Sequence, residues 1–226
     1  MCINEDESCE ATQDAENNAR MQQVKEQDSV FALFRDSRFR LNTLILTLLW
    51  STSSYSFYFT EFYMKYVPVQ NVYYLALLMG CSDLMTTGSF NLVKRFITTK
   101  QILILGTLFL SISSLTLSIS LFATNPSDIA SIAFSMQVFF SVMVFGMRFF
   151  SGLTFVAVYF ANGEYFPTLL KGAIFAVTNV AARLATVLSP LVAELMGNPS
   201  VTVALFGVAA CFSAFRLVKP TETKAI

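Results

Sequence analysis

The chain has no histidine among its 226 residues, and only 13% of its residues are charged. The absence of histidine excludes His-dependent acid–base catalysis, Ser–His nucleophiles and His-ligated metals. A soluble domain carries about 25% charged residues, so a surface with this little charge must face something other than water. The net charge is zero and the basic residues form no stripe that could follow phosphates, which excludes nucleic acid as a partner.

Cysteines are few, and their placement predicts neither cross-links nor metal. Cys2 and Cys9 lie in a polar tail, whereas Cys81 and Cys211 lie in apolar runs. This arrangement is neither a disulfide framework nor a paired metal-ligand motif. The apolar runs hold no carboxylates paired at helical spacing and no recognisable nucleophile–base pair. We therefore expect no enzymatic activity, no metal and no cofactor.

What the sequence has in abundance is apolar side chains, which make up 54% of the residues and gather in six long runs. Each run reaches or approaches the roughly 17–25 residues that a spanning helix needs. The sequence therefore predicts an all-α membrane protein with six transmembrane helices. The runs cover residues 41–63, 71–93, 102–123, 132–161, 172–193 and 200–217.

Other segments flank this predicted transmembrane unit, residues 41–217. Residues 1–29 contain eight acidic residues and few large apolar ones, which predicts a disordered cytoplasmic tail. Residues 30–40 mix Phe and Leu with arginines, a composition typical of a short helix on the membrane surface. Residues 218–226 form a C-terminal tail.

Positive charge gathers in alternate loops between the runs. By the positive-inside rule these loops, and therefore both termini, are predicted to be cytoplasmic. The loops on the opposite side carry a single basic residue, Lys65. The basic residues of the cytoplasmic set are Arg35, Arg38, Arg40, Lys94, Arg95, Lys100, Lys171, Arg216, Lys219 and Lys224.

Three charged residues lie deep inside the runs. Arg183 is the twelfth of 22 residues in the fifth run, which spans about 33 Å as a helix and so places it near the bilayer midplane. An arginine at that depth costs roughly 2.5–3.5 kcal/mol. Asp83, eleven residues before Lys94, lies at a similar depth, and Arg148 lies in the fourth run.

Two interpretations of these charges stay open. Asp83 could pair with Arg183 or Arg148 as a structural ion pair, or the charges could line a cavity and meet a charged solute. Asp83 and Arg183 occupy the second and fifth runs. These are corresponding positions if the six helices form two inverted groups of three, a recurring plan in transporters.

The first run has an unusually polar face. Trp50, Phe57 and Tyr58 add aromatic surface to it, which suits an amphipathic solute. Close helix packing through small hydroxyl residues is the alternative interpretation. The hydroxyl residues, spaced three or four apart, are Thr43, Thr47, Ser51, Ser54 and Tyr58.

Two stretches resemble the organic anion/cation/carnitine transporter family of the major facilitator superfamily. They are NGEYFPTLLKGAIFAVTNVAARLATVLSPLVAEL, residues 162–195, and FALFRDSRFRLNTLILTLLW, residues 31–50. The first resembles the end of helix ten and helix eleven of that family, and the second resembles the entry to helix seven. The resemblance covers residues 30–224 and corresponds to the C-terminal six of the family's twelve helices.

The resemblance implies an alternating-access carrier whose cavity is shared with a second half, either an N-terminal half or a homodimer partner. Family members that carry organic anions have an arginine at the position of Arg183, so an anionic substrate is expected. Phe57 and Tyr58 match aromatic substrate contacts, and Asp83 matches a helix-eight carboxylate. Gly-Met-Arg, ending in Arg148, falls where the family has Gly-Lys. Thr87 departs from the family, because anion carriers often have lysine there.

The implied substrate site therefore comprises Arg183, Tyr58, Phe57, Trp50, Arg148 and Asp83. The expected cytoplasmic gate comprises Glu164, Pro167, Lys171, Lys94 and Arg95, and Glu164 and Lys171 help to close it through switchable ion pairs. The loop Lys94–Lys100 departs from the family, because it lacks the Gly-Arg-Arg gating pattern expected after helix eight. The family resemblance implies the plasma membrane as the location. The alternative function is a truncated, non-transporting membrane protein that binds a partner through its acidic tail.

Overall fold

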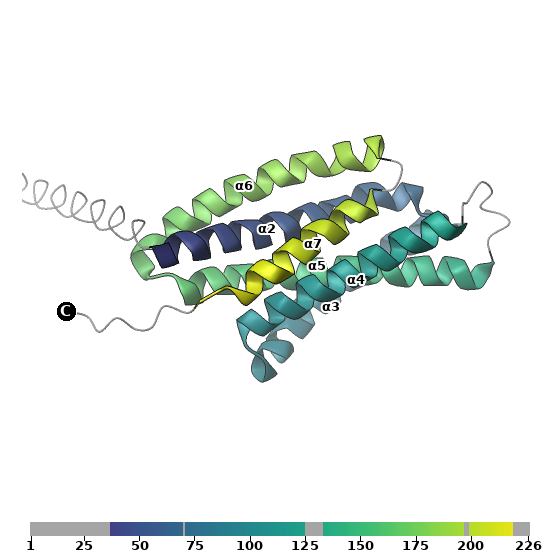
Figure 1. Cartoon of the computed structure of the whole chain (residues 1–226). Helices are drawn as coiled ribbons and strands as arrows, with labels where there is room; N and C mark the ends of the chain where they lie inside the picture. The colour runs from purple at the N-terminus through teal and green to yellow at the C-terminus, as the bar shows by residue number, and fades with distance from the viewer. Residues whose placement is uncertain (1–36, 70, 125–132, 197–198, 219–226) are drawn as a thin grey trace, which may run out of the picture.

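A computed structural model of the chain describes residues 37–69, 71–124, 133–196 and 199–218. These residues form an all-helical bundle of six α-helices and one short 3₁₀-helix, η1 (Figure 1). The elements are α2 (Ser37–Tyr63), η1 (Met64–Tyr66), α3 (Val72–Phe96), α4 (Thr99–Thr124), α5 (Phe134–Tyr165), α6 (Thr168–Leu195) and α7 (Ser200–Phe215).

The six predicted helices are confirmed, with shifted boundaries. The fourth was predicted over 132–161 and extends over Phe134–Tyr165, and the sixth ends at Phe215 rather than at 217. Residues 37–40, predicted as part of a separate surface helix, form the first turn of α2. The remainder of that helix, the acidic tail over 1–29 and residues 219–226 lie outside the described residues.

Local sequence signals set several helix ends. The side chain of Asn71 accepts a hydrogen bond from the amide of Tyr73 at 2.9 Å and so caps the start of α3. α5 ends at Tyr165 because Phe166 is extended, as the residue before a proline usually is. Pro167 then precedes the first turn of α6, where its missing amide is not needed.

The helices run alternately up and down the bundle (Figure 1). α2 packs against α6, α5 and α7, while α4 packs mainly against α5 and α7. α3 packs mainly against α5 alone. This arrangement leaves α3 and α6 at the periphery of the bundle, each with one main neighbour.

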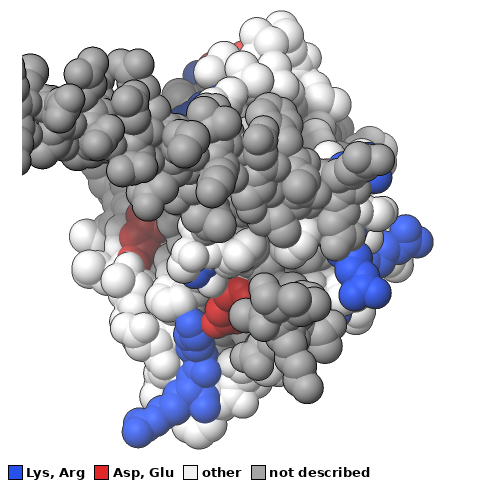
Figure 2. All heavy atoms as spheres, turned by 90° about the vertical axis from the view of Figure 1, so that its left-hand side faces the viewer, with Lys and Arg blue, Asp and Glu red and all other residues white. Residues whose placement is uncertain are grey.

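Basic side chains gather at one end of the bundle, which faces the viewer in Figure 2. This end contains the start of α2, the turns joining α3 to α4 and α5 to α6, and the end of α7 (Figure 1). The described basic residues there are Arg38, Arg40, Lys94, Arg95, Lys100, Lys171 and Arg216, whereas Lys65 lies at the opposite end in η1. The charge asymmetry that the loops predicted is therefore present in three dimensions.

Three of the described helices are long and apolar enough to cross a membrane by length and composition: α4, α5 and the Leu170–Leu195 part of α6. α7 is apolar but has only 16 residues. Serine and threonine side chains lower the hydropathy of α2, and many of them are buried against other helices. Large apolar side chains cover much of the outer surface, as expected for an integral membrane protein.

α4 and α5 approach closely at Gly106. A Cβ atom there would lie 2.5 Å from the Thr154 hydroxyl oxygen, whereas a Cβ at the exposed Gly88 would meet nothing within 4 Å. We predict that Gly106→Leu lowers the free energy of unfolding by about 1–3 kcal/mol through overpacking. Thermal unfolding of the detergent-solubilised chain measures this. Gly88→Leu is the control, and equal unfolding temperatures for the two variants would contradict the prediction.

Candidate solute site

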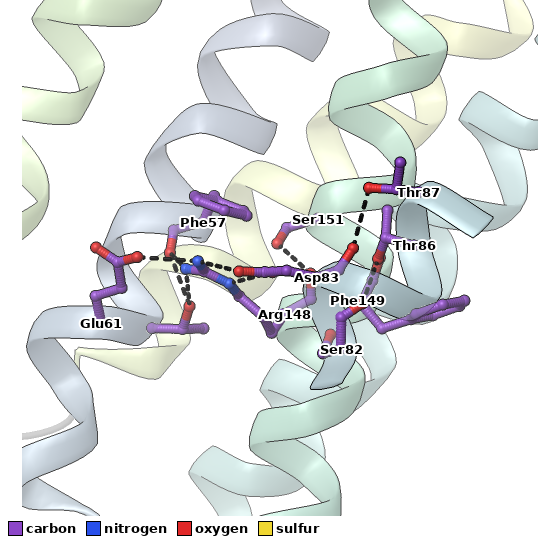
Figure 3. Close-up of polar contacts among 10 residues, drawn as sticks. Phe57, Glu61, Ser82, Asp83, Thr86, Thr87, Arg148, Phe149 and Ser151 are labelled. Carbon is purple, nitrogen blue, oxygen red and sulfur yellow. Dashed lines mark hydrogen bonds and ion pairs between the residues drawn. The ribbon is translucent and has the colours of Figure 1, made fainter. Parts of the chain in front are cut away.

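Arg148, in the middle of α5, is the centre of a polar cluster that joins three helices (Figure 3). Its side chain is almost completely buried, with the residue only 3% exposed. Its Nε and Nη2 atoms donate to the two carboxylate oxygens of Asp83 on α3, both at 2.8 Å. Nη2 also donates to Glu61 of α2 at 2.9 Å. A planar guanidinium suits this forked geometry, which a lysine could not reproduce.

The remaining donors of Arg148 are also used. Nη1 donates to the backbone carbonyl of Phe57 at 2.7 Å and contacts the Thr60 hydroxyl at 3.5 Å. The guanidinium carbon lies 3.3 Å from the centroid of the Phe57 ring, a cation–π contact. A guanidinium has five N–H donors, and the five hydrogen bonds to Asp83, Glu61, Phe57 and Thr60 use them all. In this conformation Arg148 therefore has no donor left for a solute.

The cluster is negative as a whole because one guanidinium faces two carboxylates. The side chains of Asp83 and Glu61 are 41% and 45% exposed, so both carboxylates retain access to the surroundings of the bundle. The charge of Arg148 can stay buried because two carboxylates at hydrogen-bonding distance compensate it, although these carboxylates are themselves partly exposed. Of the two partners that the sequence left open for Asp83, the structure brings it to Arg148.

Sequence reasoning missed Glu61. This residue lies near the end of the first apolar run, where a charged side chain is expected at the membrane surface. It nevertheless follows Phe57 by four residues and therefore lies on the same face of α2. That spacing was the available signal.

Arg183 lies apart from this cluster. Its side chain is exposed on α6, and no hydrogen bond or ion pair joins it to any residue that the structure describes. It lies within electrostatic range of Tyr159 of α5, as does Tyr58. Arg183 is thus the deep cation whose donors remain available. Tyr159, which the sequence analysis did not single out, belongs to its surroundings.

An aromatic wall connects the two arginines. The ring of Phe57 lies 6.3 Å from that of Phe155, and Phe155 lies 5.2 Å from Tyr159. Phe57 also contacts Tyr58 at 5.7 Å. The wall therefore begins at Phe57, which makes the cation–π contact with Arg148, and ends at Tyr159, which lies within electrostatic range of Arg183.

Trp50 lies behind this wall rather than on its surface. The indole is 1% exposed and lies 4.7 Å from Tyr159 and 4.9 Å from Phe175, measured between ring centroids. A buried ring in this position supports its neighbours and offers no face to a solute. The structure therefore differs from the predicted direct stacking of Trp50 on a substrate.

The predicted gate residues divide into two groups at the basic end of the bundle. Glu164, near the end of α5, lies 3.2 Å from Lys94 Nζ and accepts a hydrogen bond from the Thr99 hydroxyl at 2.9 Å. Lys94 also sits 3.7 Å from the centroid of the Phe160 ring. These contacts join the ends of α3 and α5 to the start of α4. Arg95 is exposed beside them.

In this conformation Lys171 lies outside the Lys94–Glu164 ion pair, so the predicted switchable ion pair of Lys171 stays a prediction. Its backbone carbonyl accepts a hydrogen bond from Asn162 Nδ2 at 3.3 Å, which ties the first turns of α6 to α5. Pro167 marks the start of α6. The carboxylate of Glu164 instead faces Lys94, because the end of α3 lies next to the end of α5.

A second ionic contact lies at the opposite end of the bundle. Glu194, near the end of α6, accepts hydrogen bonds from Lys65 and from the Tyr66 hydroxyl, both in η1. The hydrogen bonds to Glu194 and Tyr66 raise the pKa of Lys65 above its ordinary value. Among the described residues, no group of three or more Cys, Asp or Glu side chains could hold a metal ion.

Comparison with known proteins relates the sequence of the chain to solute transporters. Residues 3–226 match the family described as Sugar (and other) transporter. Organic anion transporter 3 of Oryctolagus cuniculus is 29% identical over 174 residues, which is 75% of this chain. The matched region is 29% of that relative, so the chain spans less than a third of the length of the curated protein that it matches.

The five contacts of Arg148 make a stability test possible. We predict that Arg148→Lys lowers the free energy of unfolding by about 1–3 kcal/mol, because a lysine has fewer donors and cannot bridge Asp83, Glu61 and the Phe57 carbonyl. The expected loss of stability is smaller than for a fully buried ion pair, because both carboxylates are partly exposed. Thermal unfolding in detergent is the measurement. Arg183→Lys is the matched control, and an equal loss in that variant would contradict the central position of Arg148.

Proposed function

Because the chain belongs to the sugar (and other) transporter family of the major facilitator superfamily, a family of transporters and not of enzymes, we propose that it moves small organic ions, and organic anions in particular, across a membrane by alternating access. The observation that carries the proposal is the contrast between two deep arginines. Arg148 is saturated by protein groups, whereas Arg183 is exposed with its donors available.

The packing of the helices supports a 3+3 inverted repeat. If α2, α3 and α4 are exchanged with α5, α6 and α7, the α2–α6 contact becomes the α5–α3 contact. The same exchange turns the α4–α5 contact into the α7–α2 contact. The α2–α5 and α4–α7 contacts map onto themselves. Such internal symmetry is typical of transporters that hold their solute near the bilayer midplane, where two repeats meet.

The faces of α3 and α6 that carry Asp83 and Arg183 require cover. Only 22% of the apolar window of α6 is buried, compared with 50% for α4 and α5. A guanidinium facing lipid at this depth would be costly. We therefore propose that a second six-helix unit, from the same polypeptide or from a second copy, completes the cavity, and that all six helices of the present unit span the membrane.

Within that cavity Arg183 binds the carboxylate or sulfonate of the solute. A charge-assisted hydrogen bond of this kind is short and about twice as strong as a neutral one. Phe57, Tyr58 and Tyr159 contact the apolar body of the solute. The buried Trp50 packs against Tyr159 and supports these rings from the interior of the bundle. Arg148, with Asp83 and Glu61, sets the positions of α2, α3 and α5 around the solute.

The two ionic contacts at the ends of the bundle act as gates in this proposal. The Lys94–Glu164 pair closes the basic end, which the positive-inside rule places in the cytoplasm. The Lys65–Glu194 pair closes the other end by joining η1 to α6. Pro167 and Lys171 lie at the start of α6, next to the proposed cytoplasmic gate. Alternating access requires that each contact breaks when the cavity opens on its side.

Transport by cells that express the complete gene product tests the proposal. A radiolabelled aromatic carboxylate is the expected substrate, and a quaternary ammonium of similar size is the comparison. We predict that Arg183→Gln lowers carboxylate uptake by about tenfold or more, since a hydrogen bond between charged groups contributes roughly 1.5–3 kcal/mol. Arg183→Lys should retain part of the uptake because it keeps the charge.

Arg216→Gln is the matched control, since Arg216 is also exposed but lies at the end of α7. Unchanged carboxylate uptake by Arg183→Gln would remove Arg183 from the solute site. Wild-type protein that reaches the cell surface and accumulates neither solute would support the non-transporting alternative instead.

A further inference from the structure

The turn between α3 and α4 lies at the basic end of the bundle, which faces the viewer in Figure 2. An open basic hollow lies at this turn. One part of it, an open groove of about 310 Å³, is lined by residues 94–99 and Glu164. A neighbouring open groove of about 510 Å³ is lined by Asn91, Leu92, Lys94 and Arg95. Lys94 and Arg95 line both, so the two grooves meet at these side chains. The charged residues of the lining carry a net charge of +1.

Arg95 is the basic side chain in this hollow that is free to bind a ligand. The ammonium of Lys94 is held by Glu164 and by the Phe160 ring. Lys100, the second residue of α4, donates to the backbone carbonyls of Phe215 and Leu217 at 2.9 and 2.8 Å. Arg95 is exposed, and no hydrogen bond or ion pair joins it to any described residue.

The start of α4 adds donors suited to a phosphate. Thr99 and Lys100 belong to the first turn of this 26-residue helix, so their amides have no intrahelical acceptor. A helix N-terminus carries a partial positive charge and binds phosphate oxygens. Here it lies in the same groove as Arg95. The Gln101 amide is already capped by the Thr98 hydroxyl, and the Thr98 amide by the Gln101 side chain. The hollow thus combines the Arg95 guanidinium with the amides of Thr99 and Lys100.

An exposed apolar stripe leads along α3 to this hollow. Leu77, Leu84 and Leu92 recur at intervals of two helical turns and are all exposed. Phe96, beside Arg95, is 78% exposed. Leu92 lies nine residues, or about two and a half turns, from Asp83 and therefore on the opposite side of α3. The stripe is thus separate from the face that the proposed second unit would cover.

We propose that the α3–α4 turn binds the headgroup of an anionic phospholipid that carries a phosphate monoester, with the acyl chains lying along the apolar stripe of α3. A soluble phosphate would use the hollow but would have no use for the stripe, so both features together indicate a lipid. Basic pockets at the cytoplasmic ends of membrane helices suit such headgroups. The inference rests on the proposed orientation, which places this turn at the cytoplasmic surface.

The test uses the detergent-purified chain and a fluorescent dioctanoyl phosphatidylinositol bisphosphate, with binding followed by fluorescence anisotropy. We expect Arg95→Gln to weaken binding about fivefold, the contribution of one basic residue near a lipid surface. Arg216→Gln, at the same end of the bundle, should leave binding unchanged. Both side chains are exposed, and thermal unfolding verifies that each variant stays folded.

Two further measurements separate the lipid from other phosphates. Phe96→Ser should weaken binding of the lipid but not of inositol trisphosphate, which has the phosphates without the chains. Unlabelled dioctanoyl phosphatidylcholine, which has the chains without the extra phosphates, should compete poorly. Equal weakening by Arg95→Gln and Arg216→Gln would mean diffuse charge attraction and overturn the site. Competition by inositol trisphosphate as strong as by the lipid would overturn the lipid assignment.

These measurements are independent of transport. A chain that binds the lipid but fails to move the carboxylate would refute the transport proposal and leave the lipid site standing. Transport that depends on Arg183, together with lipid binding unaffected by Arg95→Gln, would do the reverse.

Discussion

The rest of this structure depends on the neutralisation of one buried guanidinium. Arg148 joins α5 to Asp83 of α3 and to Glu61 and the Phe57 carbonyl of α2. In a low-dielectric environment an uncompensated charge is far costlier than any single apolar contact is favourable. The three helices must therefore remain close to one another. α3, which has few other neighbours, depends on this network more than any other helix does.

The same network separates the roles of the two deep arginines. All five donors of Arg148 are used within the protein, so in the proposed transport cycle its part is to position α2, α3 and α5. Arg183 is exposed on α6, and no hydrogen bond or ion pair joins it to any residue that the structure describes. A pair of arginines that sequence alone would treat as equivalent is thus divided into one structural and one available cation by their neighbours.

The outer surface of the bundle is also divided. α4 and α7 pack against each other and present apolar side chains outward, as helices do against lipid. α6 is far less buried and carries an exposed arginine. α3 shows two different faces, one with Asp83 and one with an apolar stripe ending beside Arg95. Each face suits a different neighbour: a second helical unit for the first and a phospholipid for the second.

The sequence by itself determined the six helices, the gathering of basic residues at one end and the three deep charges, because apolar runs, helical rise and loop charge are local properties of the chain. It also contained enough motif to indicate the transporter family. It could not choose between Arg148 and Arg183 as the partner of Asp83, include Glu61, or place Trp50 behind Tyr159. Those outcomes depend on which helices are in contact and on how each helix is rotated about its axis. Residues 65 positions apart, such as Asp83 and Arg148, meet only when the whole bundle packs.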